Sequence, residues 1–172
     1  MTETTIPARS LQDLAAALSE EQDHYQLLLD LARQQGEMMT THSVEELEAN
    51  ARRLTEGLAA ADLVRIRRER LASSVMQASG AAIPGSLSSW LQTQPEAVRE
   101  ILGEPVQQVR RTAGELARAN ELNRRLANFC LDLVEEEAAV LRRCLLEDPA
   151  GCYDSGAQPA TKGQGGVLQR QA

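Results

Sequence analysis

The sequence is poor in aromatic residues, which make up only 2% of its 172 residues. Sandwich and α/β folds draw on aromatic and β-branched side chains, whereas leucine, alanine, glutamate, glutamine and arginine are typical of long helices. This chain is rich in the second group, and its hydrophobic fraction of 42% is enough to build a core. The composition therefore predicts an all-α protein.

Long hydrophobic runs and a signal peptide are also missing. No apolar stretch approaches the roughly 20 residues that cross a bilayer. The net charge is −7, and no basic face interleaved with aromatic residues accompanies it. Nucleic acid and anionic membrane both repel such a chain. We therefore expect a cytoplasmic protein with no nucleic-acid partner and no membrane insertion.

Cysteine is scarce and irregularly placed. Cys130, Cys144 and Cys152 have neither the spacing nor the companions of a metal site or a redox pair. Cys130 and Cys144 lie on an apolar helix seam, where a thiol acts as a small hydrophobic side chain. We expect these two to be buried and structural.

Histidine occurs only twice. Glu21 and His24 form one E-x-x-H motif, the spacing with which four-helix di-iron proteins bind a metal, but His42 has no matching glutamate. No other pattern indicates a nucleophile, a phosphate-binding loop or a polar pocket. The sequence therefore predicts no metal, no cofactor and no catalytic site, and a binding protein is favoured over an enzyme.

The longest helical pattern covers residues 105–147, from Pro105 to the breaker Asp148-Pro149. Its seam, a row of residues at alternating four- and three-residue steps, predicts about six heptads facing a partner. Asn120 and Asn123 lie on this seam, where an amide either fixes the register against another helix or marks where the seam opens to water; we favour register. The seam comprises Val109, Ala113, Leu116, Asn120, Asn123, Ala127, Cys130, Val134, Glu137, Leu141 and Cys144.

Two earlier segments repeat the same pattern and predict helices over about 10–40 and 43–79, joined by a connector short enough to require antiparallel packing. The acidic first helix should then meet the arginines of the second. The residues at these three- and four-residue steps are Leu11, Leu14, Leu18, Glu21, Tyr25, Leu28, Ala32, Gln35 and Met39 in the first helix, and Leu47, Ala51, Leu54, Leu58, Ala61, Val64, Leu71 and Val75 in the second.

Residues 86–102 read as two short helical turns that cap the bundle, with Trp90 closing the core. Residues 148–172 are rich in glycine and nearly devoid of apolar residues, so we expect a flexible tail. The predicted architecture is an elongated antiparallel bundle of three long helices over 1–147, followed by the tail.

The order of these features resembles the FlgN-like flagellar type III secretion chaperones. Leu27-Leu28-Leu29-Asp30-Leu31 follows a glutamate and a tyrosine in the first helix, and the second ends in Arg-Glu-Arg-Leu-Ala before a glycine. The run Asn120-Glu-Leu-Asn123-Arg-Arg-Leu126 and the late Tyr153-Asp-Ser-Gly156 complete the likeness, which covers residues 10–158.

The resemblance implies a cytoplasmic chaperone that binds the C-terminal helical regions of hook-filament junction (hook-associated) proteins. It would prevent their premature assembly and deliver them to the export gate or ATPase components of the flagellar export apparatus. We expect the client to bind at Leu133, Val134, Leu141 and Leu145, although all four could equally be core. The resemblance further implies that Tyr153 docks at the export gate.

A structural or adaptor coiled coil is the alternative interpretation. The heptads would support a homodimer as well as a monomeric bundle. Light scattering distinguishes the two, because a self-contained bundle has a mass of 18.8 kDa and a scaffold is an obligate oligomer.

Overall fold

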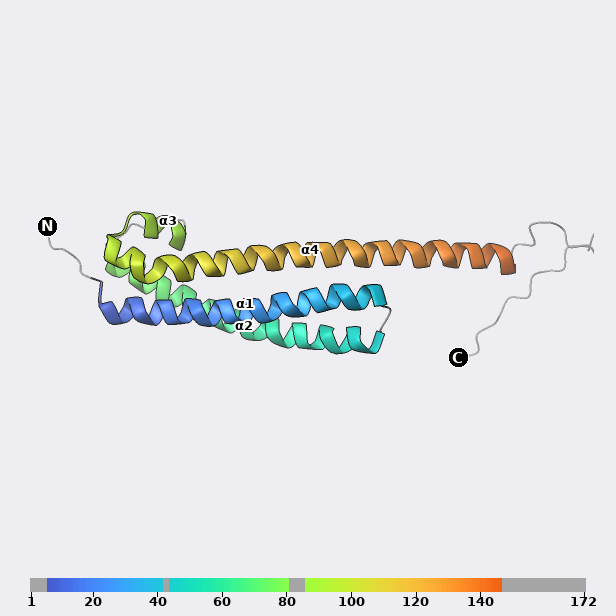
Figure 1. The fold of residues 1–172 in the computed structure, drawn as a ribbon, viewed down its shortest axis with the longest axis horizontal. Helices are drawn as coiled ribbons and strands as arrows, with labels where there is room; N and C mark the ends of the chain where they lie inside the picture. Colours follow the sequence, from blue (N-terminus) through green and yellow to red (C-terminus); the bar gives the residue numbers. More distant parts are fainter. Residues whose placement is uncertain (1–5, 42–43, 81–85, 147–172) are drawn as a thin grey trace, which may run out of the picture. The chain divides into compact units, whose positions relative to one another are not determined.

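The computed structural model describes residues 6–41, 44–80 and 86–146, with side chains in the last range through residue 143. It contains α1 (Ala8–Thr41), α2 (Val44–Ala78), α3 (Leu87–Gln92) and α4 (Glu96–Leu146) (Figure 1). No strand occurs in these ranges, and the predicted all-α class is confirmed. The chain divides into two units, Met1–Leu126 and Ala127–Ala172, with the boundary inside α4.

Within the first unit, α1 and α2 run antiparallel. Glu21 of α1 pairs with Arg68 of α2, whereas the carbonyl of Leu31 accepts a hydrogen bond from Asn50, so residue numbers rise along one helix as they fall along the other. The predicted meeting of the acidic first helix with arginines of the second is also observed, because Oε2 of Glu20 lies 2.9 Å from Nη1 of Arg67 on the exposed side.

A buried ion pair fixes the middle of this contact. The carboxylate of Glu21 is fully buried, and it accepts hydrogen bonds from Nε and Nη2 of Arg68 at 2.9 and 3.0 Å. The hydroxyl of Tyr25 donates to Glu21 Oε1 at 3.0 Å. Burial of the phenol, followed by the charge of Glu21 and its hydrogen bond, raises the pKa of Tyr25 to about 12. Arg68 and Tyr25 together satisfy the carboxylate of Glu21, whose charge would otherwise be costly inside the bundle.

The face that α2 turns toward α1 differs from the predicted one in the first half of the helix. Leu58 is 56% exposed and Ala51 is exposed, whereas Asn50 and Gly57 are buried. A Cβ atom at Gly57 would lie 3.0 Å from Cδ2 of Leu28. The prediction was wrong here because it followed the largest apolar side chains, while the helices approach each other where the side chains are smallest.

The apolar core lies where α1, the end of α2, α3 and the start of α4 meet. Trp90 of α3 is buried in it, as expected, and its indole N–H donates to the hydroxyl of Ser79 at 3.0 Å. This bond satisfies the one polar atom that the large ring brings inside. The buried members of the cluster are Leu11, Leu14, Leu18, Ala72, Val75, Trp90, Leu91, Val98, Leu102 and Val106.

The start of α4 also corrects the sequence-based prediction. The helix begins at Glu96, so Pro105 lies inside it and the second predicted turn is the first part of α4. Proline there leaves the carbonyl of Ile101 without its helical donor. Ile101 is on the exposed side, where water can replace that donor. The first predicted turn corresponds to α3, capped by Ser86, whose hydroxyl accepts from the N–H of Ser89.

Candidate partner-binding surface

The first part of α4, residues 96–126, uses its seam for contact within the first unit. Asn123 is buried, and its Nδ2 donates to the carbonyl of Ala32 at 2.6 Å and to Oε1 of Gln35 at 3.1 Å. Asn120, the other polar residue predicted on the seam, is exposed. The structure therefore brings only Asn123 to the contact between α1 and α4.

A glycine on α1 lets the two helices come this close. A Cβ atom added at Gly36 would lie 2.8 Å from Oδ1 of Asn123, which is closer than a real side chain tolerates. Because Asn123 is tied by two hydrogen bonds, it cannot move aside without losing them. Gly36 thus sets the distance at which the amide reaches the α1 backbone.

Sequence reasoning missed a second buried asparagine. Asn50 of α2 is 2% exposed, and its Nδ2 donates to the carbonyl of Leu31 at 3.1 Å. Its Oδ1 has no partner among the described residues. Leu31 and Ala32 are consecutive, so amides from α2 and α4 hold α1 at the same level. The seven-residue spacing between Asn50 and the small residue Gly57 was the available signal.

The second part of α4, residues 127–146, carries the predicted client-binding residues. Leu133, Val134 and Leu141 are exposed by 40%, 61% and 59% of their surface. Leu145 belongs to the helix, but its side chain lies outside the described residues, as does the whole of Tyr153. We use "the exposed apolar face" for the residues Phe129, Leu133, Val134, Val140 and Leu141, all exposed.

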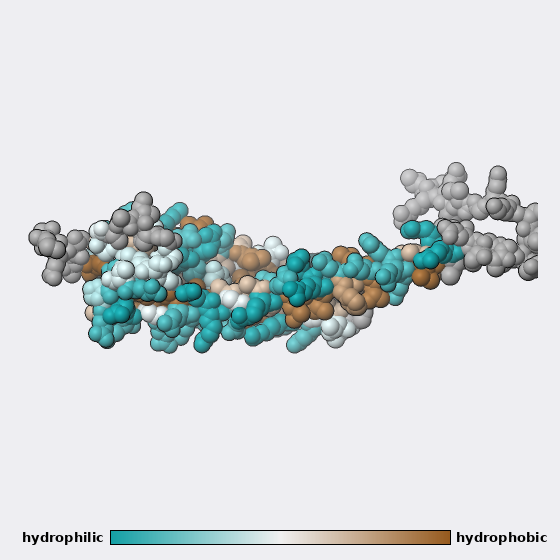
Figure 2. All heavy atoms as spheres, turned by 90° about the horizontal axis from the view of Figure 1, so that it is seen from above, coloured by the Kyte–Doolittle hydropathy of each residue, from teal (hydrophilic) through white to brown (hydrophobic). Residues whose placement is uncertain are grey.

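Apolar patches lie between hydrophilic ones at the surface of the chain in the space-filling view (Figure 2). On α4, Cys130 is exposed, so the prediction that it is a buried structural cysteine was wrong. Its seam position indicated an apolar face correctly, but nothing in the described chain covers the thiol. The side chains of Cys144 and Cys152 lie outside the described residues.

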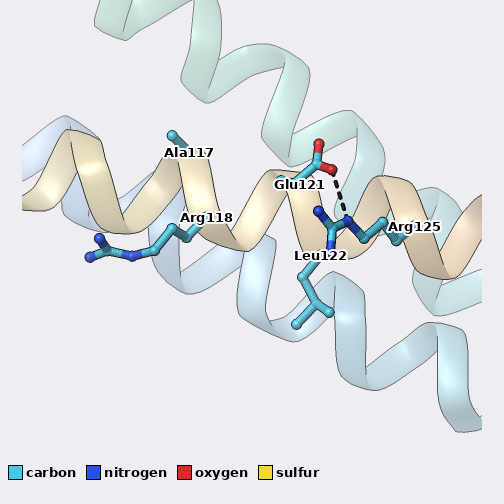
Figure 3. Close-up of a pocket in the computed structure, with 5 residues that line it drawn as sticks. All are labelled: Ala117, Arg118, Glu121, Leu122 and Arg125. Atoms are coloured by element: carbon cyan, nitrogen blue, oxygen red, sulfur yellow. Dashed lines mark hydrogen bonds and ion pairs between the residues drawn. The ribbon is translucent and has the colours of Figure 1, made fainter.

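A shallow hollow on α4 lies before this segment and is lined by Ala117, Arg118, Glu121, Leu122 and Arg125 (Figure 3). Glu121 accepts hydrogen bonds from Arg124 and from Arg125, each with a shortest distance of 2.9 Å. These two bonds lower the pKa of Glu121 to about 2. The carboxylate is thus held ionised by its own helix, and the hollow offers no group poised for acid–base chemistry.

The described residues also bear on metal binding and on membranes. Glu21 of the E-x-x-H motif is bound by Arg68 and Tyr25. Over the described ranges, no group of three or more His, Cys, Asp or Glu side chains could hold a metal ion. None of the described helices combines the length and the hydropathy that a membrane span requires.

Together, these features define a helical protein that presents an apolar helix face suited to contact with other proteins. The family model described as FlgN protein matches residues 1–161, so the chain belongs to the FlgN family of flagellar export chaperones. This family consists of chaperones rather than enzymes, and its members bind flagellar hook-associated proteins. Neither the curated proteins nor the solved structures yielded a match.

Proposed function

We propose that this chain binds the C-terminal helical regions of hook-filament junction proteins in the cytoplasm and delivers them to the flagellar export apparatus. The observation that carries the proposal is the exposed apolar face, including Leu133, Val134 and Leu141. An amphipathic helix awaiting export has an apolar stripe of its own, and laying it on this face shields both from water. Premature assembly of the client is then blocked because its assembly helix is covered.

The helical body that would present this face is the bundle of α1, α2 and α4 with α3 as its cap. Support comes from the pairing of Glu21 with Arg68 between α1 and α2, and of Asn123 with Ala32 between α4 and α1. In the proposed arrangement α2 runs antiparallel to both other long helices. Asn123 and its α1 partners fix the register of the bundle, and Asn120 stays at its surface.

A single charge placed in the face tests the client-binding function. Leu141→Glu should abolish co-purification of the junction protein's C-terminal fragment, since a carboxylate would have to be buried against an apolar helix. The matched control is Ala139→Glu on the same helix, which adds the same charge among the charged residues Glu135, Arg142 and Arg143 and should leave binding intact. Helical circular dichroism should be unchanged in both. Retained binding by Leu141→Glu would refute the placement.

Docking at the export gate is the second part of the proposal and rests on Tyr153. The likeness to the family's C-terminal tyrosine supports it. Tyr153→Ala should weaken capture of the chaperone by the purified export-gate protein without changing client affinity. Equal capture of the unchanged protein and the Tyr153→Ala variant would contradict the assignment of Tyr153 to gate docking.

The alternative, an adaptor coiled coil or a homodimer, is favoured by the same exposed face, since a second copy could also cover it. Light scattering of the free protein separates the two readings. A mass of 18.8 kDa supports the chaperone as a free monomer, and a stable oligomer whose mass does not change when client is added supports the scaffold.

A further inference from the structure

One charged residue stands within the exposed apolar face. On a helix, the surface neighbours of a residue lie three and four positions away. For Glu137 these neighbours are Leu133, Val134, Val140 and Leu141, all apolar and all exposed. Glu137 is itself exposed and has no ion pair or hydrogen bond among the described residues. The carboxylate is therefore surrounded by the side chains that a client would cover.

Glu121, which lies earlier in the same helix, is a contrasting case. Its neighbours at three and four positions are Arg124 and Arg125, and both bind it at 2.9 Å. At the same spacing from Glu137 stand Val140 and Leu141. The helix thus supplies two counter-charges to Glu121 and none at the corresponding positions to Glu137.

We propose that Glu137 selects the client: the helix that covers the exposed apolar face must carry an arginine or lysine within its own apolar stripe, placed to pair with this carboxylate. The proposal rests on the proposed function. Covering the face removes water from Glu137, and a carboxylate buried without a partner is costly. A cation of the client removes this cost and adds charge-assisted hydrogen bonds. The same carboxylate weakens the binding of a client helix whose stripe is purely apolar.

A second copy of the chain does not meet this requirement. Its only cations in the described part of the segment, Arg142 and Arg143, are rotated around the helix from Glu137 by roughly 140° and 120° at 3.6 residues per turn. Both lie on the acidic, hydrophilic side of the helix with Asp132 and Glu135. Self-pairing through the apolar faces would place Glu137 against leucine or against its own copy. The charge pattern therefore favours a foreign helix as the occupant.

Calorimetric titration of the full-length chaperone with the junction protein's C-terminal helical fragment tests the proposal. We expect Glu137→Gln to weaken binding at least about tenfold, and Glu137→Leu to do the same, because each leaves the client's cation buried without a counter-charge. The matched control, Glu135→Gln, removes the same charge on the opposite side of the helix, roughly 160° from Glu137 at 3.6 residues per turn, and should stay within about twofold of the unchanged protein.

Charge exchange gives the decisive result. Glu137→Arg should lose binding, and a client in which the paired arginine or lysine is replaced by glutamate should restore it to that variant alone. If Glu137→Leu binds the client as tightly as the unchanged protein or more tightly, while Leu141→Glu still abolishes binding, the selection by Glu137 is overturned and the proposed function stands. If Leu141→Glu also binds normally, the client-binding face itself is misplaced. Dimerisation of the free protein that Glu137→Leu strengthens would assign the face to a second copy.

Discussion

The two parts of α4 follow the same heptad pattern and are treated differently by the rest of the chain. In residues 96–126, Leu102 and Val106 are buried with α1, α2 and α3, and Asn123 binds the α1 backbone. In residues 127–146, Leu133 and Leu141 are exposed. The difference shows that heptad periodicity determines which side of a helix is apolar, whereas the neighbouring elements determine whether that side is covered. An apolar side that is left uncovered is available to a partner.

The largest expected effect tests this comparison directly through one leucine from each part. Leu102→Ala should lower the free energy of unfolding by about 3 kcal/mol, because a fully buried leucine leaves a cavity. Leu141→Ala should change it by less than about 0.5 kcal/mol, because its side chain is already largely in water. Urea denaturation followed by circular dichroism measures both. Equal losses would mean that the second part of α4 is covered in solution.

The contrast between the two leucines also explains what the sequence could predict. The all-α class, the pairing of acidic α1 with the arginines of α2 and the placement of Trp90 in the core follow from composition, charge and local breakers, which act at short range. The exposure of Cys130 could not follow from them, because it depends on which elements reach that level of the helix. The start of α4 at Glu96 was missed because proline usually begins a helix and is tolerated inside one only where its freed carbonyl meets water.

The candidate site likewise has features that the sequence could predict and features that depend on neighbouring elements. Periodicity correctly identified Leu133, Val134 and Leu141 as one face, but it could not tell whether that face was core or surface. Asn123 was recognisable as a polar residue on a seam, whereas its partner Ala32 was not, since any backbone carbonyl looks alike in sequence. Glu137 was recognisable in the sequence as a seam residue, but its proposed role in client selection depends on the exposure of its neighbours.

A second pair of substitutions compares a buried with an exposed ion pair through two arginines of α2. Arg68→Ala should lower the free energy of unfolding by about 2 kcal/mol, since it leaves the fully buried Glu21 without its counter-charge. Arg67→Ala removes the ion pair with Glu20 on the exposed side, and its effect should stay below about 0.5 kcal/mol. Chemical denaturation at neutral pH and low salt compares them. A similar loss from both would show that the burial of Glu21 contributes little.

The glycines provide a pair with effects of opposite sign. Gly36→Ala should destabilise the protein by about 1 kcal/mol, because the new methyl group displaces Asn123 from its two bonds. Gly114→Ala meets nothing within 4 Å and should stabilise α4 by up to about 1 kcal/mol through helix propensity. Thermal unfolding of both variants beside the unchanged protein gives the sign. Stabilisation by Gly36→Ala would contradict the close approach at Asn123.

The smallest expected effect concerns alkaline pH. The folded-state pKa of Tyr25, about 12, lies above the ordinary value of 10.0, so the folded chain retains a proton that the unfolded chain has lost. This contribution to stability is complete below pH 10 and disappears as the pH rises from 10 to 12. Absorbance titration of tyrosinate in a Tyr153→Phe variant should place the midpoint near 12, and Tyr25→Phe should flatten the decline in stability. A midpoint near 10 would show that the phenol is solvated.

Asn50 and Asn123 each bind α1 through a peptide oxygen, at Leu31 and at Ala32, and only Asn123 adds a bond to a side chain, that of Gln35. Every amino acid supplies that oxygen, so the alignment of the helices is indifferent to which apolar side chains occupy these two positions, provided that they fit. The alignment is sensitive at Gly36, where an added Cβ atom would lie 2.8 Å from Oδ1 of Asn123. Redesign of the neighbouring apolar contacts is therefore free to proceed around a fixed register.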